Sequence, residues 1–210
     1  MAIKYKDGLM FAADCLSSYG SLMRFKNARR LYKLGESTLI GASGDMSDFQ
    51  YMQEKLEELM NKERNWEDDQ VVGTKSIYSL MQAMLYNRRS NINPLWNSYI
   101  VGGKDKGEFF LGYVDMYGTT FQSASVSTGL GKHYAQPIMR KALETKGEDM
   151  SEDEAREVLL QCLRVLYYRD TRSLNVYQIG KVTDGGVEIS EPLHLDSDWE
   201  FGRNVRGYGL

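Results

Sequence analysis

Cysteine, histidine and proline are scarce in this chain of 210 residues, which contains two cysteines, two histidines and three prolines. Cys15 and Cys162 each lie alone in an apolar context, which predicts buried, reduced thiols and excludes a disulfide framework. His133 and His194 lie far apart in the sequence and lack the spacing of metal ligands, so no zinc site is expected. We therefore expect neither a metal nor another cofactor.

Excess positive charge and long apolar runs are also absent. The net charge is -3 and the isoelectric point is about 5.5, whereas a nucleic-acid-binding protein shows a basic face or stripe. No apolar run approaches the roughly 20 residues that a membrane span needs, and the first residues do not form a signal peptide. The partners are therefore expected to be neither nucleic acids nor membranes.

Tyrosine and methionine, in contrast, are abundant, with 14 and 11 residues. Both are enriched in the surfaces that proteins use to bind one another. From His194 onward the sequence becomes polar but still contains Trp199, Phe201 and Tyr208. We expect this tail to become ordered on a partner, with a frayed, solvated terminus as the alternative.

Hydrophobic periodicity and turn residues divide the chain into groups of strands and groups of helices. Alternating apolar side chains predict strands, and apolar side chains three and four residues apart predict helices. The order is strands, two helices, strands, two helices, strands. The predicted strands cover 2–33 with breaks at 7–8 and near 19–20, then 38–42, 98–102, 108–115, 119–127, 175–183 and 187–189; the predicted helices begin at 47 and 151 and cover 75–89 and 132–144.

Local signals predict where these helices begin and end. Ser47 with Gln50, and Ser151 with Glu154, fit the capping box, in which a serine accepts a backbone N–H and the side chain three residues later reaches back. Pro137 should be tolerated only in the first turn of its helix, because proline has no N–H to donate. The acidic loop 66–69 is expected to end the first helical unit.

The grouping of the elements decides the predicted fold class. Helices and strands do not alternate singly, which excludes a doubly wound parallel sheet, and grouped elements favour antiparallel sheets with helices on the outer faces. We predict an α+β fold, a four-layer αββα sandwich in which two antiparallel sheets lie between helix pairs. Residues 1–195 are expected to form this domain and residues 196–210 a C-terminal tail.

Common motifs of nucleotide binding and of serine hydrolysis are incomplete. Gly129-Leu130-Gly131 follows a strand and precedes a helix, but Tyr134 occupies the position of the third glycine of a dinucleotide-binding loop. No G-x-S-x-G turn is present to hold a nucleophilic serine beside His133. Neither activity is expected.

Several short segments follow one another in a shared register from Ile3 to about Ile189. They are Phe11-Ala12-Ala13-Asp14 with Gly20, Gly41-Ala42-Ser43-Gly44-Asp45 with Ser47-Asp48, Ser127-Thr128-Gly129-Leu130-Gly131 with Tyr134-Ala135, and Tyr168-Arg169-Asp170 with Ser173. Each segment is weak alone, but their shared register is specific. Together they resemble the proteasome beta subunit family. Within the family the closest resemblance is to the non-catalytic member at the seventh position of the beta ring.

The resemblance implies an N-terminal nucleophile hydrolase fold. In catalytic members an N-terminal threonine, exposed when a propeptide is cleaved, attacks a peptide carbonyl through its hydroxyl. Its own amine, with an unperturbed pKa of about 7.7–8.0, can serve as the base. An aspartate, a lysine close to the hydroxyl and a serine–aspartate pair complete the site.

Compared with that pattern, two catalytic positions are altered in this chain. Arg30 stands where the family has its lysine, and its planar fork has a different hydrogen-bond geometry. Leu130 stands where active members have a serine between two glycines, and supplies no hydroxyl. Asp14, Asp170 and Ser173 remain. The resemblance thus implies that these five positions are remnants of an active site, that none is catalytic, and that a threonine would lie before residue 1, so that the first strand is truncated.

The carboxylate of Asp14 directly follows an apolar strand and needs a partner if it is buried. We expect it to form a buried or half-buried ion pair with Arg30. A turn acid facing water is the alternative.

The resemblance also implies the function and the partners. We expect a non-catalytic subunit of the 20S core that contributes to the beta ring and to the chamber for ubiquitin-dependent degradation, in the cytoplasm and nucleus. Its partners would be the other subunits of a seven-membered beta ring, the alpha-ring subunits, and the facing beta ring through the tail. Two alternatives stay open: a catalytic threonine endopeptidase subunit whose N-terminal threonine is missing from the sequence, and an unrelated hydrolase or binding module on the same fold.

Overall fold

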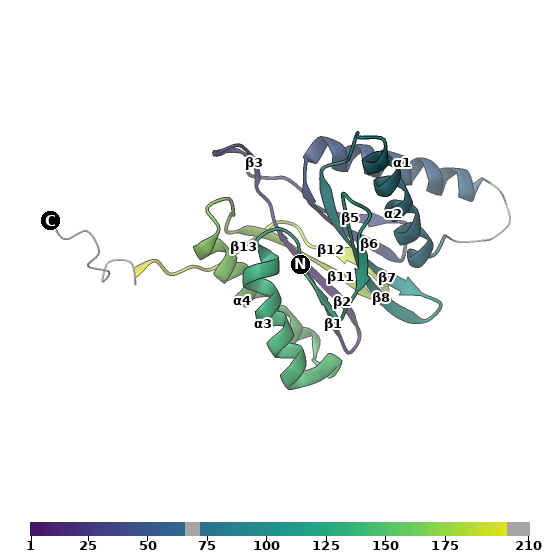
Figure 1. The fold of residues 1–210 in the computed structure, drawn as a ribbon. Helices are drawn as coiled ribbons and strands as arrows, with labels where there is room; N and C mark the ends of the chain where they lie inside the picture. The colour runs from purple at the N-terminus through teal and green to yellow at the C-terminus, as the bar shows by residue number, and fades with distance from the viewer. Residues whose placement is uncertain (66–71, 201–210) are drawn as a thin grey trace.

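The computed structural model describes residues 1–65 and 72–200, which form four stacked layers in the order helices, sheet, sheet, helices (Figure 1). All pairs of neighbouring strands in the two sheets are antiparallel. The predicted αββα sandwich, the fold of the N-terminal nucleophile hydrolases, is therefore confirmed. The predicted boundary between a domain and a tail at residue 195 stays a prediction.

The first sheet, called here the β2 sheet, contains both the beginning and the end of the described chain. Its strand order is β10-β1-β2-β11-β12, and β13 also pairs with β11. The strands are β1 (Ala2–Tyr5), β2 (Gly8–Asp14), β10 (Ser125–Val126), β11 (Val176–Thr183), β12 (Gly186–Ile189) and β13 (Leu193–His194).

The second sheet, called here the β7 sheet, follows the order of the chain as β5-β6-β7-β8-β9. A separate two-stranded ribbon, β3 with β4, lies between β2 and β5 in the sequence. The strands of the sheet are β5 (Leu31–Leu34), β6 (Thr38–Gly44), β7 (Asn97–Asp105), β8 (Glu108–Asp115) and β9 (Thr120–Gln122), and those of the ribbon are β3 (Ser17–Tyr19) and β4 (Leu22–Phe25).

Two helix pairs cover the outer faces of the sheets (Figure 1). The helices α1 (Met46–Arg64) and α2 (Thr74–Ser90) pack on the β7 sheet through one apolar cluster. The helices α3 (Gly131–Lys146) and α4 (Glu152–Arg169) pack on the β2 sheet through another, and a third cluster fills the space between the sheets. No helix within the described ranges combines the length and apolar character needed to cross a membrane.

Strand β2 shows why one apolar run can serve two of these layers. Successive side chains of a strand point to opposite faces. Leu9 and Phe11 therefore face the other sheet, and Met10 and Ala12 face α3 and α4. Because both faces are covered, the strand is apolar at consecutive positions and not at alternate ones.

The start of α1 differs from the prediction. The N-cap is Asp45, whose Oδ1 accepts the N–H of Asp48 at 2.9 Å, while Ser47 lies inside the helix. The predicted capping box at Ser47 is therefore wrong, because a carboxylate two residues earlier satisfies the free N–H and also faces the positive end of the helix dipole. The capping box of Ser151 and Glu154 is confirmed. The acidic loop 66–69 lies outside the described residues.

Two further expectations are corrected. Pro137 lies in the second turn of α3 and not in the first. The N–H that it lacks would have bonded to the carbonyl of His133, which is on the exposed side of the helix, where water can take its place. The predicted strand 119–127 is two strands in different sheets: Gln122 of β9 pairs with Gly112, and Val126 of β10 pairs with Ala2. This segment therefore connects the two sheets.

Candidate functional site

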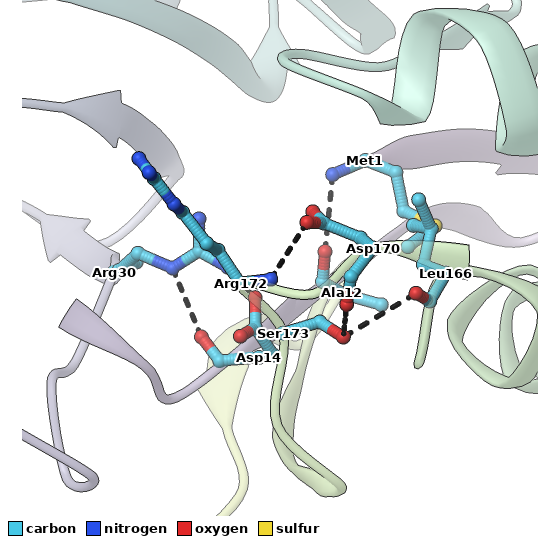
Figure 2. A network of polar contacts seen from close by, with 8 residues as sticks. All are labelled: Met1, Ala12, Asp14, Arg30, Leu166, Asp170, Arg172 and Ser173. Carbon is cyan, nitrogen blue, oxygen red and sulfur yellow. Dashed lines mark hydrogen bonds and ion pairs between the residues drawn. The ribbon is translucent and has the colours of Figure 1, made fainter. Parts of the chain in front are cut away.

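A pocket with a volume of about 150 Å³, called here the central pocket, lies where β2 leaves its sheet. It is lined by the end of β2, the residues before β5, the loop before α3 and the segment after α4. These segments are far apart in the sequence. All five positions singled out from the sequence line it, namely Asp14, Arg30, Leu130, Asp170 and Ser173, and Figure 2 shows four of them together.

Asp14 and Arg30 form the ion pair that the sequence predicts (Figure 2). The Nη2 atom of Arg30 donates to Oδ1 of Asp14, and its Nε donates to the backbone carbonyl of Asp14 at 2.9 Å. Both side chains are largely buried, with exposed fractions of 21% for Arg30 and 17% for Asp14. Oδ2 of Asp14 is buried and accepts no hydrogen bond from any described residue. The guanidinium is thus held by two contacts to one residue.

Asp170 and Ser173 close the end of α4 and do not pair through their side chains (Figure 2). The carboxylate of Asp170 accepts the N–H of Arg172 at 2.8 Å. The hydroxyl of Ser173 donates to the carbonyl of Asp170 at 2.7 Å and to that of Leu166 at 3.3 Å. The carbonyl of Leu166 also accepts the N–H of Asp170 at 2.7 Å, so these contacts hold the turn that follows α4.

Leu130 occupies the N-cap of α3, and its side chain is 45% exposed. No side chain caps the first N–H groups of this helix within the described structure. Leucine can neither accept those N–H groups nor provide a hydroxyl. Leu130 therefore adds an apolar side chain to the lining of the pocket.

The amine of Met1 and the backbone of Arg172 also make polar contacts around the pocket, and the sequence predicts neither contact. The Met1 amine donates to the carbonyl of Ala12 at 3.0 Å (Figure 2). Burial, and then the positive charge of Arg30, lower the pKa of this amine to about 5. No local pattern could have revealed this, because the contact depends on the pairing of β1 with β2.

The chemistry available in the pocket is limited. Among the described residues no lysine or histidine lines it. Arginine side chains do not act as bases in proteins. The described residues also contain no group of three or more acidic, histidine or cysteine side chains that could hold a metal ion.

The model of the family described as "Proteasome subunit" matches residues 1–182. The chain belongs to the proteasome subunit family. Family membership accounts for the αββα fold.

Similar proteasome subunits are found in animals, plants and fungi. Proteasome subunit beta type-4 of Xenopus laevis is 41% identical over 208 residues, covering 99% of this chain and 86% of that protein. Proteasome subunit beta type-4 of Arabidopsis thaliana is 42% identical, covering 96% and 80%. The probable proteasome subunit beta type-7 of Schizosaccharomyces pombe is 40% identical, covering 100% and 81%. This chain is therefore placed among the beta-type members of the family.

Proposed function

We propose that this chain is a non-catalytic beta subunit of the 20S proteasome core, which helps to form the wall of the chamber for ubiquitin-dependent degradation. The observation that carries the proposal is the set of contacts that Arg30 makes. Arg30 stands where the family has its lysine, and its guanidinium is held on both the carboxylate and the backbone of Asp14. The site therefore contains an ion pair that joins the end of β2 to the residue before β5.

This site differs from a catalytic site in the groups that could transfer a proton. A lysine near the nucleophile can lose its proton when it is buried, whereas arginine stays charged at every relevant pH. The hydroxyl of Ser173 is also committed to two backbone carbonyls. Leu130 adds a second, independent defect, because it has no hydroxyl. Groups of a catalytic site act as a unit, so correcting one position would not produce turnover.

A catalytic threonine endopeptidase subunit is the second candidate. Asp14, Asp170 and Ser173 are retained. Those features would suit an N-terminal nucleophile. They do not supply the lysine or the serine, so we favour the non-catalytic function.

A covalent inhibitor directed at N-terminal threonines tests the proposal on the native particle. The catalytic beta subunits of the same particle serve as the internal positive control. We expect those subunits to gain the mass of the inhibitor and this chain to keep its own mass in intact-protein mass spectrometry. A labelled form of this chain would contradict the proposal.

The proposed partners are the other beta subunits of a seven-membered ring, the alpha-ring subunits, and the facing beta ring through residues 196–210. Unlike neighbours in a ring meet through heterologous contacts, in which two different surfaces pair. Family membership supports assembly with other proteasome subunits. We also propose a location in the cytoplasm and nucleus, which imaging of a tagged chain would test. Sedimentation of the tagged chain with a particle much heavier than 24.0 kDa would support assembly, and a free monomer would contradict it.

A further inference from the structure

The ribbon of β3 and β4 contains the longest unbroken run of exposed residues in the described chain. Figure 1 shows it standing away from both sheets, near the label β3. Every residue from Ser18 to Asn27 is exposed. A hydrogen bond from the N–H of Ala28 to the carbonyl of Cys15, 2.9 Å long, ties its base to the body. A Cβ added to Gly20 at the tip would meet no atom within 4 Å. The body of the protein therefore leaves the ribbon uncovered.

The ribbon carries large apolar side chains on this exposed surface. Tyr19 is 81% exposed, Phe25 61% and Leu22 56%, and Met23 is exposed as well. A two-stranded ribbon alone is marginally stable in water. Contiguous exposed apolar side chains with a polar surround mark a surface where another protein binds. Tyrosine, phenylalanine and methionine are enriched in the centres of such interfaces.

The charges of the ribbon indicate the chemistry of that protein. The segment from Cys15 to Gly35 contains no aspartate or glutamate. The cations near its end are paired, Arg29 with Glu191 at 2.8 Å and Lys33 with Glu36 at 3.0 Å. In the described structure neither Arg24 nor Lys26 pairs with a carboxylate. The ribbon thus presents an apolar centre with two unneutralised cations beside it.

We propose that the β3–β4 ribbon docks into an apolar depression rimmed by carboxylates on a different, neighbouring subunit of the same particle. The inference deepens the proposed function and rests on it. Complementary charges at the rim of an interface guide the partner and suppress wrong ones. A second copy of this ribbon is a poor fit, because it would add two more cations and no carboxylate from residues 15–35 to neutralise them. Two cations are also too few for a nucleic-acid surface.

Site-specific photo-crosslinking in the assembled particle tests this contact. Tyr19 is replaced by a photoreactive phenylalanine derivative in the tagged, full-length chain, and the intact particle is isolated before irradiation. We expect one main adduct, whose mass is the sum of this chain and one other proteasome subunit. Peptides of that adduct should place the crosslink beside aspartate or glutamate residues.

Substitutions supply a second measurement. In the double variant Tyr19→Ser with Phe25→Ser, the fraction of chain in the particle should fall about tenfold or more, as for the loss of aromatic anchors at the centre of an interface. Charge reversal by Arg24→Glu with Lys26→Glu should also lower incorporation, and Lys106→Glu at the exposed turn between β7 and β8 is the matched control. Circular dichroism of each free chain verifies that the variants fold.

The outcomes separate this inference from the proposed function. A wild-type chain found only as a free protein would overturn both. A chain that enters the particle while its ribbon yields no adduct, or an adduct with a second copy of itself, would overturn the docking inference alone. Folded ribbon variants that enter the particle as well as the wild type would overturn it too.

Discussion

At the residue scale, one contact decides the character of the central pocket. Asp14 ends a buried strand, and Arg30 begins the next long segment of the body sixteen residues later. Each of these charges is largely buried and relies on the other. Burying an ion pair costs desolvation energy for both charged groups. Removing one partner is strongly destabilising, because the other charge then stays buried without compensation. The stability of the fold therefore depends on this pair, which also differs from the residue pattern of catalytic members.

Replacing Arg30 by alanine should destabilise the fold by about 2–4 kcal/mol, because the Asp14 carboxylate would be left buried without its partner. Asp14→Ala should cost a similar amount, and the double variant less than the sum of the two. Urea unfolding of the purified chain measures this. The control is Lys33→Ala, which removes the more exposed pair with Glu36 and should cost less than about 1 kcal/mol. Additive effects of Arg30→Ala and Asp14→Ala would show that the pair is not coupled.

The two thiols should be unreactive in the folded protein. Burial raises the pKa of the Cys162 thiol to about 12, and its Sγ lies 3.6 Å from the carbonyl oxygen of Ala135. Burial also raises the pKa of Cys15. Because only the thiolate attacks, a disulfide reagent at pH 8 should label neither cysteine quickly, and should label both after denaturation. Fast reaction of the native chain would mean that one thiol is accessible.

At the element scale, the same residue type can have different roles at the starts of two helices. Ser47 and Ser151 are both serines near the start of a helix. Only Ser151 caps one, with its Oγ accepting the N–H of Glu154 at 3.3 Å. At α1 the cap is Asp45. The local pattern is the same, but the position at which the chain enters the helix differs.

Capping substitutions should therefore separate these residues. Ser151→Ala and Asp45→Ala should each lower the free energy of unfolding by about 1 kcal/mol, because an N–H at the helix start loses its acceptor. Ser47→Ala is the matched control and should change stability by less than about 0.5 kcal/mol, as for other substitutions away from a cap. Thermal or urea unfolding measures all three. If Ser47→Ala lowered the free energy of unfolding as much as Asp45→Ala does, Ser47 would be the residue that caps α1.

The junction of β6 and α1 requires a glycine at residue 44. Gly44 has a φ of +104°, and a Cβ there would collide with the carbonyl oxygen of Trp96. Gly44→Ala should therefore cost about 3 kcal/mol or more, from backbone strain and the steric clash together.

Gly107 is the matched control for this substitution. Its φ is +90°, but a Cβ there would meet nothing within 4 Å, so Gly107→Ala should cost only the strain of about 1–2 kcal/mol. Urea unfolding of the two variants gives the comparison. Equal losses would show that the close approach of Trp96 to Gly44 has no energetic weight.

At the scale of the whole molecule, the described part of the C-terminal segment is joined to the body. Strand β13 pairs with β11, and the ring of Trp199 packs edge-on against Tyr167 and Tyr168 of α4, with centroids 5.8 and 4.9 Å away. This clasp holds Trp199 against α4.

Deleting residues 196–210 should leave the sandwich folded and weaken the pairing of two beta rings. Of the deleted residues, those that the structure describes belong to no strand of either sheet. Native mass spectrometry of particles that contain the shortened chain should show more half-particles than the wild type. Trp199→Ala should give a smaller effect of the same kind, because it removes the clasp and keeps the segment. Normal pairing with the shortened chain would contradict the proposed contact.

The sequence by itself determined the element order, the αββα class, the family and the ion pair of Asp14 with Arg30. These follow from local periodicity and from residue types in a specific register, which depend on neighbours along the chain. The tertiary structure alone decided that residues 119–127 divide between two sheets, that Asp45 caps α1, and that Ser173 serves the backbone of α4. It also showed that the β3–β4 ribbon stands uncovered. Each of these depends on which distant segment lies alongside, and periodicity along the chain carries no information about that neighbour.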